Sequence, residues 1–133
     1  MRRAAGLAGL AILALTASAP LAAAPGGPVN PFECFRVDQW EGTTAASPRD
    51  LYIRVGHHDI WHLGMAEACS GAMSPGRVRV DAFIVSDGWI CKPSDLELSV
   101  APAGFSTAFP CTVGELHKLT ANEAAALPKK WLP

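Results

Sequence analysis

The segment from Arg77 to Lys92 constrains the fold more than any other part of the chain. Apolar side chains recur at every second position from Val78 to Ile84, and a period of two residues is typical of a strand with two different faces. Asp87-Gly88 then separates two apolar runs, which favours a hairpin because a type I′ turn needs positive φ at both central residues. The predicted cross-strand pairs are Ser86 with Trp89, Val85 with Ile90, and Ile84 with Cys91. This pairing places Cys91 on the core-facing side of the hairpin.

Other segments alternate in the same way, and turn residues separate them. The predicted strands are Phe32–Trp40, Leu51–Val55, Ile60–Met65, Leu96–Val100 and Phe105–Val113. We expect Gly42–Pro48 to form a turn, Gly56–Asp59 a reversal and Gly64–Gly76 a loop. Thr120 and Glu123 form a capping-box pattern, which predicts the start of a short helix that continues over Ala124–Leu127 and stops at Pro128. About seven strands with frequent turn signals indicate an all-β domain, either a small antiparallel barrel or a sandwich, with a short C-terminal helix.

The first 24 residues, 1–24, have the features of a signal peptide. Arg2 and Arg3 precede the apolar run Leu7–Leu15, and small residues that suit cleavage follow it, at Ala17-Ser18-Ala19 or Ala22-Ala23-Ala24. The apolar run is shorter than the roughly 20 residues that a membrane span requires, so we expect no stable membrane anchor. Residues 25–31, rich in proline and glycine, form a flexible lead-in, and residues 32–133 form a single disulfide-linked β domain. The expected location is periplasmic or secreted.

The charge of the exported part argues against nucleic-acid binding. Removal of residues 1–24 leaves 109 residues with nine basic and 12 acidic side chains, a net charge of −3 with histidine neutral. The chain has no run of lysine or arginine that would contact a phosphate backbone.

Four cysteines in a short exported chain favour two disulfides. A zinc site is an alternative, but no two cysteines have the close spacing of a zinc knuckle. Free thiols are a second alternative, which the even number of cysteines disfavours. Four cysteines allow three pairings; we expect Cys69–Cys91 and Cys34–Cys111, since Cys91 would lie near the loop of Cys69, and a barrel brings its first and last strands together.

His57, His58 and His62, with Asp59, form the only local cluster of metal-ligand residue types. Imidazole and carboxylate groups suit zinc, copper or nickel. Strand alternation instead favours a polar hairpin tip with His62 facing solvent, so we expect no metal and no cofactor.

Signals for catalysis are weak. The chain contains no Gly-x-Ser-x-Gly elbow, and Ser70-Gly71 lies in a predicted loop without a neighbouring base. The carboxylates of Asp81, Asp87, Asp95 and Glu97 are scattered along the sequence. Four aromatic residues could mark a recognition surface on the outside of the domain: Trp40, Tyr52, Phe83 and Trp131.

Five short motifs lie along the exported part of the chain: Cys34-Phe-Arg-Val, Leu51-Tyr-Ile-Arg-Val-Gly56, Trp89-Ile-Cys91 followed by Asp95, Cys111-Thr-Val-Gly-Glu-Leu and Leu119-Thr-Ala-Asn-Glu. Together they resemble a family of small exported bacterial proteins that is catalogued only as a domain of unknown function. The resemblance covers nearly all of the exported chain, and the spacing of the four cysteines is its most specific part. It implies export and a compact cysteine-bearing domain, and it supplies no catalytic residue, ligand or partner.

The sequence therefore predicts an exported non-catalytic domain that binds a protein, an envelope component or a small ligand. The alternative is a metal-binding or enzymatic periplasmic protein that uses His57, His58 and His62.

Overall fold

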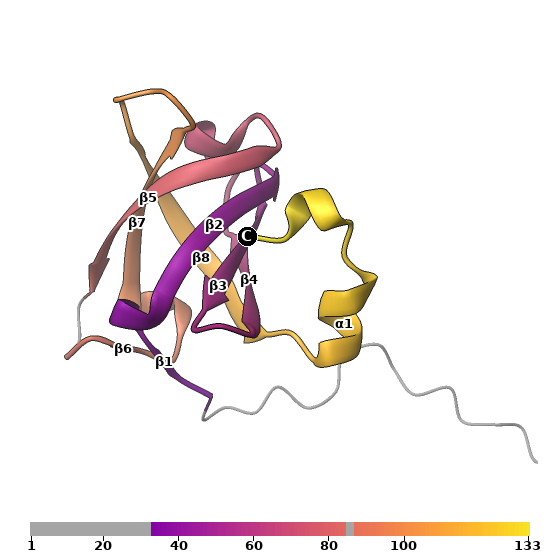
Figure 1. Ribbon diagram of the computed structural model, residues 1–133. Helices are drawn as coiled ribbons and strands as arrows, with labels where there is room; N and C mark the ends of the chain where they lie inside the picture. Colours follow the sequence, from indigo (N-terminus) through magenta and orange to yellow (C-terminus); the bar gives the residue numbers. More distant parts are fainter. Residues whose placement is uncertain (1–32, 85–86) are drawn as a thin grey trace, which may run out of the picture.

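A computed structural model describes residues 33–84 and 87–133 (Figure 1). The expected signal peptide, 1–24, and the lead-in, 25–31, lie outside the described residues. The strands are β1 (Phe35–Arg36), β2 (Trp40–Ser47), β3 (Asp50–Val55), β4 (Asp59–Met65), β5 (Gly76–Ile84), β6 (Trp89–Ile90), β7 (Leu96–Pro102) and β8 (Phe109–Lys118). The helices are α1 (Ala121–Ala126) and four short 3₁₀ turns, η1 (Val37–Gln39), η2 (Ser70–Ala72), η3 (Pro93–Asp95) and η4 (Lys129–Trp131).

Six of these strands form a closed antiparallel barrel in the order β2-β3-β4-β8-β7-β5. The prediction of a small all-β domain with a short C-terminal helix is confirmed. Of the two predicted alternatives, the fold is the barrel and not the sandwich. Alternation places one apolar face of each strand inside, and this core includes Leu51, Ile53, Leu63, Leu98 and Val100. Among the described residues, no helix is long and apolar enough to cross a membrane.

The predicted turn over Gly42–Pro48 is wrong, because most of this segment belongs to strand β2. Thr43, Thr44 and Ala45 are buried there and pair with β3. Small and hydroxyl-bearing residues resemble a turn in sequence, but against a neighbouring strand their backbone groups join the ladder and their side chains pack. The last barrel strand is also shifted: β8 begins at Phe109 and extends to Lys118, beyond the predicted end at Val113.

The central hairpin is not formed as predicted. Strand β5 pairs along its whole apolar alternation with β7, from Val78 opposite Pro102 to Ile84 opposite Leu96. Trp89 and Ile90 instead pair with Arg36 and Phe35, in a separate two-stranded sheet of β1 and β6. Gly88 has a positive φ of 87°, but Asp87 lacks the positive φ that a type I′ turn also requires. The chain bends at these two residues and does not return along β5. Of the predicted partners, Val85 and Ser86 lie outside the described residues.

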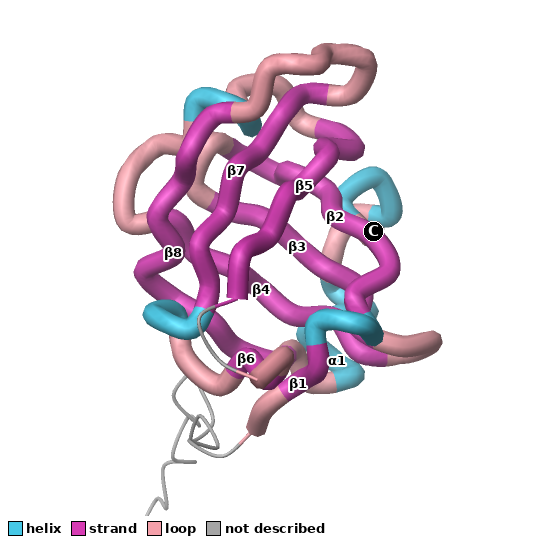
Figure 2. Tube along the Cα trace, turned by 90° about the vertical axis from the view of Figure 1, so that its left-hand side faces the viewer, coloured by secondary structure: helices cyan, strands magenta, loops and turns pink. Residues whose placement is uncertain are grey.

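The two short strands β1 and β6 meet at one end of the barrel (Figure 2). Their side chains Phe35 and Ile90 are buried in the barrel core, and the Phe35 ring packs against Trp61 with ring centroids 4.8 Å apart. Cys91 follows Ile90 and is exposed; the prediction that it faces the core is wrong because it rested on the hairpin pairing.

All four cysteines form disulfides, as predicted, but the expected pairing is wrong. The bonds join Cys34 to Cys91 and Cys69 to Cys111. The pairing of β1 with β6 brings Cys34 beside Cys91, whereas the chain of Cys69 lies against β8, where Cys111 is located. Which strands are neighbours therefore decides the connectivity.

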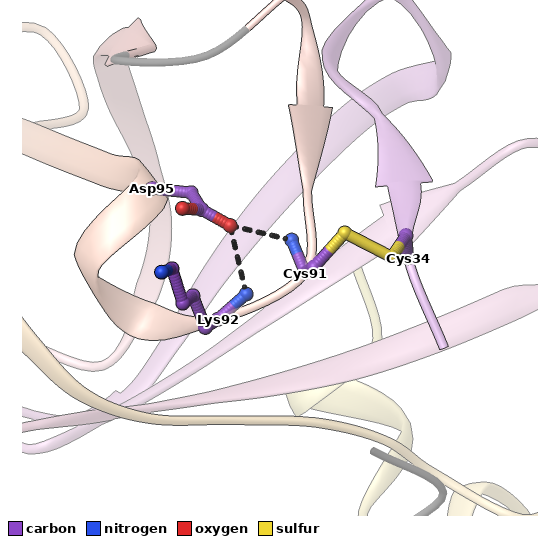
Figure 3. Close-up of a disulfide and its surroundings, with 4 residues drawn as sticks. All are labelled: Cys34, Cys91, Lys92 and Asp95. Carbon is purple, nitrogen blue, oxygen red and sulfur yellow. Dashed lines mark hydrogen bonds between the residues drawn. A yellow bond between two sulfur atoms is a disulfide. The ribbon is translucent and has the colours of Figure 1, made fainter. Parts of the chain in front are cut away.

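A carboxylate stabilises the chain beside the first disulfide. Figure 3 shows Asp95 next to Cys91, where its Oδ2 accepts hydrogen bonds from the backbone N–H groups of Cys91 at 3.0 Å and Lys92 at 3.1 Å. Asp95 thereby fixes the turn that leads from β6 through η3 into β7.

The C-terminal arm, residues 119–133, leaves the barrel after β8 and returns to it (Figure 1, yellow). The capping box is confirmed: Thr120 Oγ1 accepts from the Glu123 N–H, and Glu123 Oε2 accepts from the Thr120 N–H. At the far end of the arm, Trp131 stacks on Tyr52 of β3 with centroids 6.5 Å apart, and Arg54 donates from its guanidinium to the Pro133 oxygen.

Candidate ligand-binding cleft

The barrel has its shortest ladder between β2 and β5, whereas every other pair of neighbouring barrel strands pairs at four or more positions. Those two strands pair only at Thr44 with Arg77 and at Ala45 with Gly76, whereas β5 and β7 pair at seven positions. Figure 2 faces this side, where β7, β5 and β2 follow one another across the barrel wall. Beyond the two paired positions the strands leave a seam in the wall.

A cleft of about 430 Å³ opens along this seam, within the size range of small-molecule and peptide sites. One side is apolar and comes from the inward-facing residues of β5, and the other comes from η1 and the start of β2. The lining residues are Val37, Trp40, Glu41, Gly42, Thr43, Val78, Arg79, Val80 and Ala82.

Trp40 is held in a fixed orientation within this lining. Its indole N–H donates to Thr43 Oγ1 at 2.9 Å, and its ring meets Phe35 edge-on at 6.2 Å between centroids. The indole is thus a preformed apolar surface, which costs less entropy on binding than a freely rotating side chain.

One base and one acid stand at the rims of the cleft. Arg79 is tethered by a hydrogen bond to the Ser106 carbonyl at 3.1 Å and by an ion pair with Asp81 at 3.6 Å. Glu41 lies 3.8 Å from His57 Nδ1. The lining therefore supplies apolar contact, a fixed indole and two oppositely charged side chains.

The histidines of the predicted local cluster do not converge. His57 and His58 lie at the exposed tip between β3 and β4. His62 lies on the outer barrel face, but the expectation that it faces solvent is wrong, because its side chain is only 13% exposed. In residues 33–84 and 87–133, no three His, Cys, Asp or Glu side chains are arranged to hold a metal ion.

His62 belongs instead to a row of side chains across β3, β4 and β8. Its Nε2 is 2.9 Å from Asp50 Oδ1, and its ring lies 5.2 Å from Tyr52 and 5.1 Å from His117 between centroids. Tyr52, His62 and His117 are direct cross-strand neighbours. No local pattern in the sequence indicated His117, since only the pairing of β4 with β8 brings it beside His62.

Burial and hydrogen bonding shift the pKa values in this row. The Ser47 hydroxyl, which donates to Asp50 at 2.6 Å, and the nearby His62 hold the pKa of the Asp50 carboxyl below its ordinary value, against a smaller opposing effect of burial. Burial lowers the pKa of His117, and the neighbouring His62 lowers it further. Burial likewise raises the pKa of Tyr52. The row therefore favours an ionised Asp50 and a neutral His117, each of which lies next to His62.

A second cavity of about 290 Å³ lies beside Asp50 on the outer face. Gly64 and Gly114 form part of its lining, together with Arg49, Asp50, Met65 and Glu115. It is smaller than the cleft at the seam and lacks an extended apolar side.

The four aromatic residues predicted to mark a recognition surface are distributed over different places. Tyr52 and Trp131 stack under the C-terminal arm, Trp40 lines the cleft, and Phe83 is 68% exposed on the outer face of β5. Of the candidates for hydrolytic chemistry, Ser70 is exposed on η2, and Gly71 is buried against β7.

Comparison with protein-family models, with curated proteins and with solved structures found no match for this chain.

Proposed function

We propose that the protein is an exported, non-catalytic binding domain that holds its ligand in the cleft between β2 and β5. The two disulfides are compatible with an oxidising, extracytoplasmic location. The signal-peptide features of residues 1–24 support the same location.

One observation carries the binding role. Val78, Val80 and Ala82 point into the barrel, yet they remain only partly buried, because no described strand covers the seam beside them. A barrel of this size normally fills its interior with side chains and closes its wall. An apolar surface left open along a cleft marks a binding site.

The cleft is tested with the apolar dye 1-anilinonaphthalene-8-sulfonate on the oxidised protein. We expect one dye molecule to bind saturably. The substitution Ala82→Phe, which fills the cleft, should weaken this binding by about tenfold, equivalent to about 1.4 kcal/mol. Phe83→Ala is the matched control, since Phe83 is the next residue but lies on the outer face. Dye binding that is lost in Phe83→Ala and kept in Ala82→Phe would overturn the proposed site.

Export is tested by the intact mass of protein recovered from the periplasm or the medium. We expect a chain that begins near Pro20 or Pro25. A product that begins at Met1 and stays with the membrane fraction would contradict the proposal.

A further inference from the structure

We propose that the cleft binds an extended segment of a partner polypeptide, which adds as a strand to the free edge of β5. This inference rests on the proposed binding function of the cleft and names the class of its ligand. Three properties of β5 support it: its unpaired backbone, its side-chain period and its charges.

The backbone of β5 has hydrogen-bonding groups that no described strand uses. Successive residues of a strand direct their N–H and C=O groups alternately to the two sides. On one side β5 pairs with β7 from Val78 to Ile84. On the other side, described strands pair with it only at Gly76 and Arg77. Every second residue from Arg79 to Ile84 therefore presents its N–H and C=O groups toward the seam.

A free strand edge beside an apolar surface is what strand addition requires. Main-chain hydrogen bonds then supply affinity, and alternate side chains supply specificity. A compact apolar ligand could contact Val78, Val80 and Ala82, but it would leave the edge of β5 unpaired. An extended polypeptide satisfies the backbone and the apolar surface together.

The side chains of β5 define the complementary strand. Val78, Val80 and Ala82 face inward, so the partner needs small apolar residues at every second position. Arg79 and Asp81 face outward and are about half exposed, at 50% and 53% of their side chains. Opposite charges directly across a ladder are favourable, so an antiparallel partner places an acidic residue opposite Arg79 and a basic residue opposite Asp81.

The probe that follows from this is the blocked peptide acetyl-Thr-Val-Lys-Val-Glu-Val-Thr-amide. In antiparallel register its lysine lies opposite Asp81 and its glutamate opposite Arg79. We expect binding to ¹⁵N-labelled oxidised protein to shift the amide resonances of residues 79–84 and of residues 41–43 on β2. A peptide with lysine and glutamate exchanged keeps the composition and should bind more weakly.

Two N-methylated versions test whether the backbone takes part. The first carries methyl groups on the amide nitrogens of its three valines. The second carries them on the amide nitrogens of its lysine, its glutamate and its second threonine. Each version therefore lacks the N–H donors along one edge of the peptide strand. We expect at least one of them to bind about tenfold more weakly than the parent, because it cannot donate the main-chain hydrogen bonds of that edge. This comparison uses the unaltered protein, so it does not depend on any variant that fails to fold.

The possible results separate this inference from the proposed function. Equal binding of the parent and both N-methylated peptides would overturn strand addition. Dye binding in the cleft without any peptide binding would also overturn it, while the binding site would stand. If neither dye nor peptide bound, both proposals would fail. The protein could also self-associate through β5, which would appear as a mass that rises with concentration and as amide shifts at residues 79–84. This result would assign the edge to a second copy of this chain and would contradict the proposal of a separate partner polypeptide.

Discussion

Val80 and Val100 face each other across neighbouring strands of one barrel, yet their surroundings differ. Val100 on β7 is fully buried, with a relative exposure of 0%, because β5 and β8 flank β7 on both sides. Val80 on β5 also points inward, but it is only partly buried and lines the cleft. The same residue type at the same level of the barrel thus contributes to the core on one strand and to a candidate site on the next.

The difference shows that orientation and burial are separate properties of a strand residue. Alternation along a strand determines which way a side chain points. Whether that side chain is enclosed depends on the strands on both sides, which lie far away in sequence. The closed wall of β3, β4, β8 and β7 has these neighbours, and the seam between β2 and β5 lacks them beyond two pairs.

Removing either disulfide should have the largest effect on stability. The loops closed by Cys69–Cys111 and Cys34–Cys91 span 42 and 57 residues, so the chain-entropy model gives about 4 kcal/mol for each. We expect replacement of both Cys69 and Cys111 by alanine to cost more than replacement of Cys34 and Cys91, since Cys69 is buried at 2% exposure and its loss leaves a gap in the closed wall. Denaturant midpoints of the two double variants measure this order. A greater loss at Cys34 and Cys91 would show that the end of the barrel, and not the closed wall, limits stability.

Peptide mapping of the unreduced protein checks the connectivity itself. We expect fragments that join Cys34 to Cys91 and Cys69 to Cys111. A fragment that joins Cys69 to Cys91 would contradict the strand order of the barrel.

Gly71 provides a second contrast between the two regions. It packs on β7 so closely that a Cβ atom would overlap the Val100 carbonyl group. Gly71→Ala should therefore displace η2 from the closed wall and lower the free energy of unfolding by about 3 kcal/mol. Gly42→Ala, at the cleft, is the matched control: its Cβ would meet Pro133 at an ordinary 3.8 Å, and we expect a change within about 0.5 kcal/mol. Equal losses in thermal unfolding would refute the difference in packing.

The two valines test the comparison most directly. Val100→Ala should destabilise the protein by about 2 kcal/mol, because it removes fully buried methyl groups and leaves a cavity. Val80→Ala should cost less than about 1 kcal/mol, since part of that side chain already contacts solvent. Urea denaturation of both variants gives the difference. Equal losses of stability would mean that β5 is enclosed as fully as β7, which would contradict an open apolar surface along the cleft.

Much of the fold follows from short-range patterns in the sequence. The alternation of Leu51–Val55, of Ile60–Met65 and of Leu96–Val100 predicted strands that the structure confirms. The capping box at Thr120 and Glu123 predicted the start of the helix. Each of these signals lies within a few residues, where backbone and side-chain preferences act directly.

The features that the sequence did not predict depend on contacts between distant segments. Asp87-Gly88 predicted a type I′ hairpin turn, and only the positive φ of Gly88 is present. Strand β6 pairs instead with Phe35 and Arg36, which lie far away in the sequence. The disulfide pairing was wrong for the same reason. The cleft arises because β2 and β5 pair at two positions only, and no local pattern in either strand encodes that number.

The smallest expected effect concerns pH and the outer face of the closed wall. Burial and the neighbouring His62 hold the pKa of His117 below its ordinary value of 6.5, while Glu115 and Glu123 act in the opposite direction. The folded state therefore takes up its proton at a lower pH than the unfolded chain does. As the pH falls below about 6.5 the unfolded state is protonated first, so the free energy of unfolding decreases on acidification.

His117→Gln should remove this contribution and flatten the decline in stability between about pH 7 and pH 5. Asp50 has a pKa below its ordinary value of 3.8. Its contribution to stability is therefore fully present between pH 7 and pH 5 and is lost only as the pH falls below about 3.8. The two groups thus affect stability in separate pH ranges. His57→Gln is the matched control, since His57 is exposed at the hairpin tip with 86% of its side chain accessible. Denaturant midpoints across this pH range test the claim. An unchanged slope in His117→Gln would show that the cross-strand contact of His117 with His62 does not couple protonation to the stability of the closed wall.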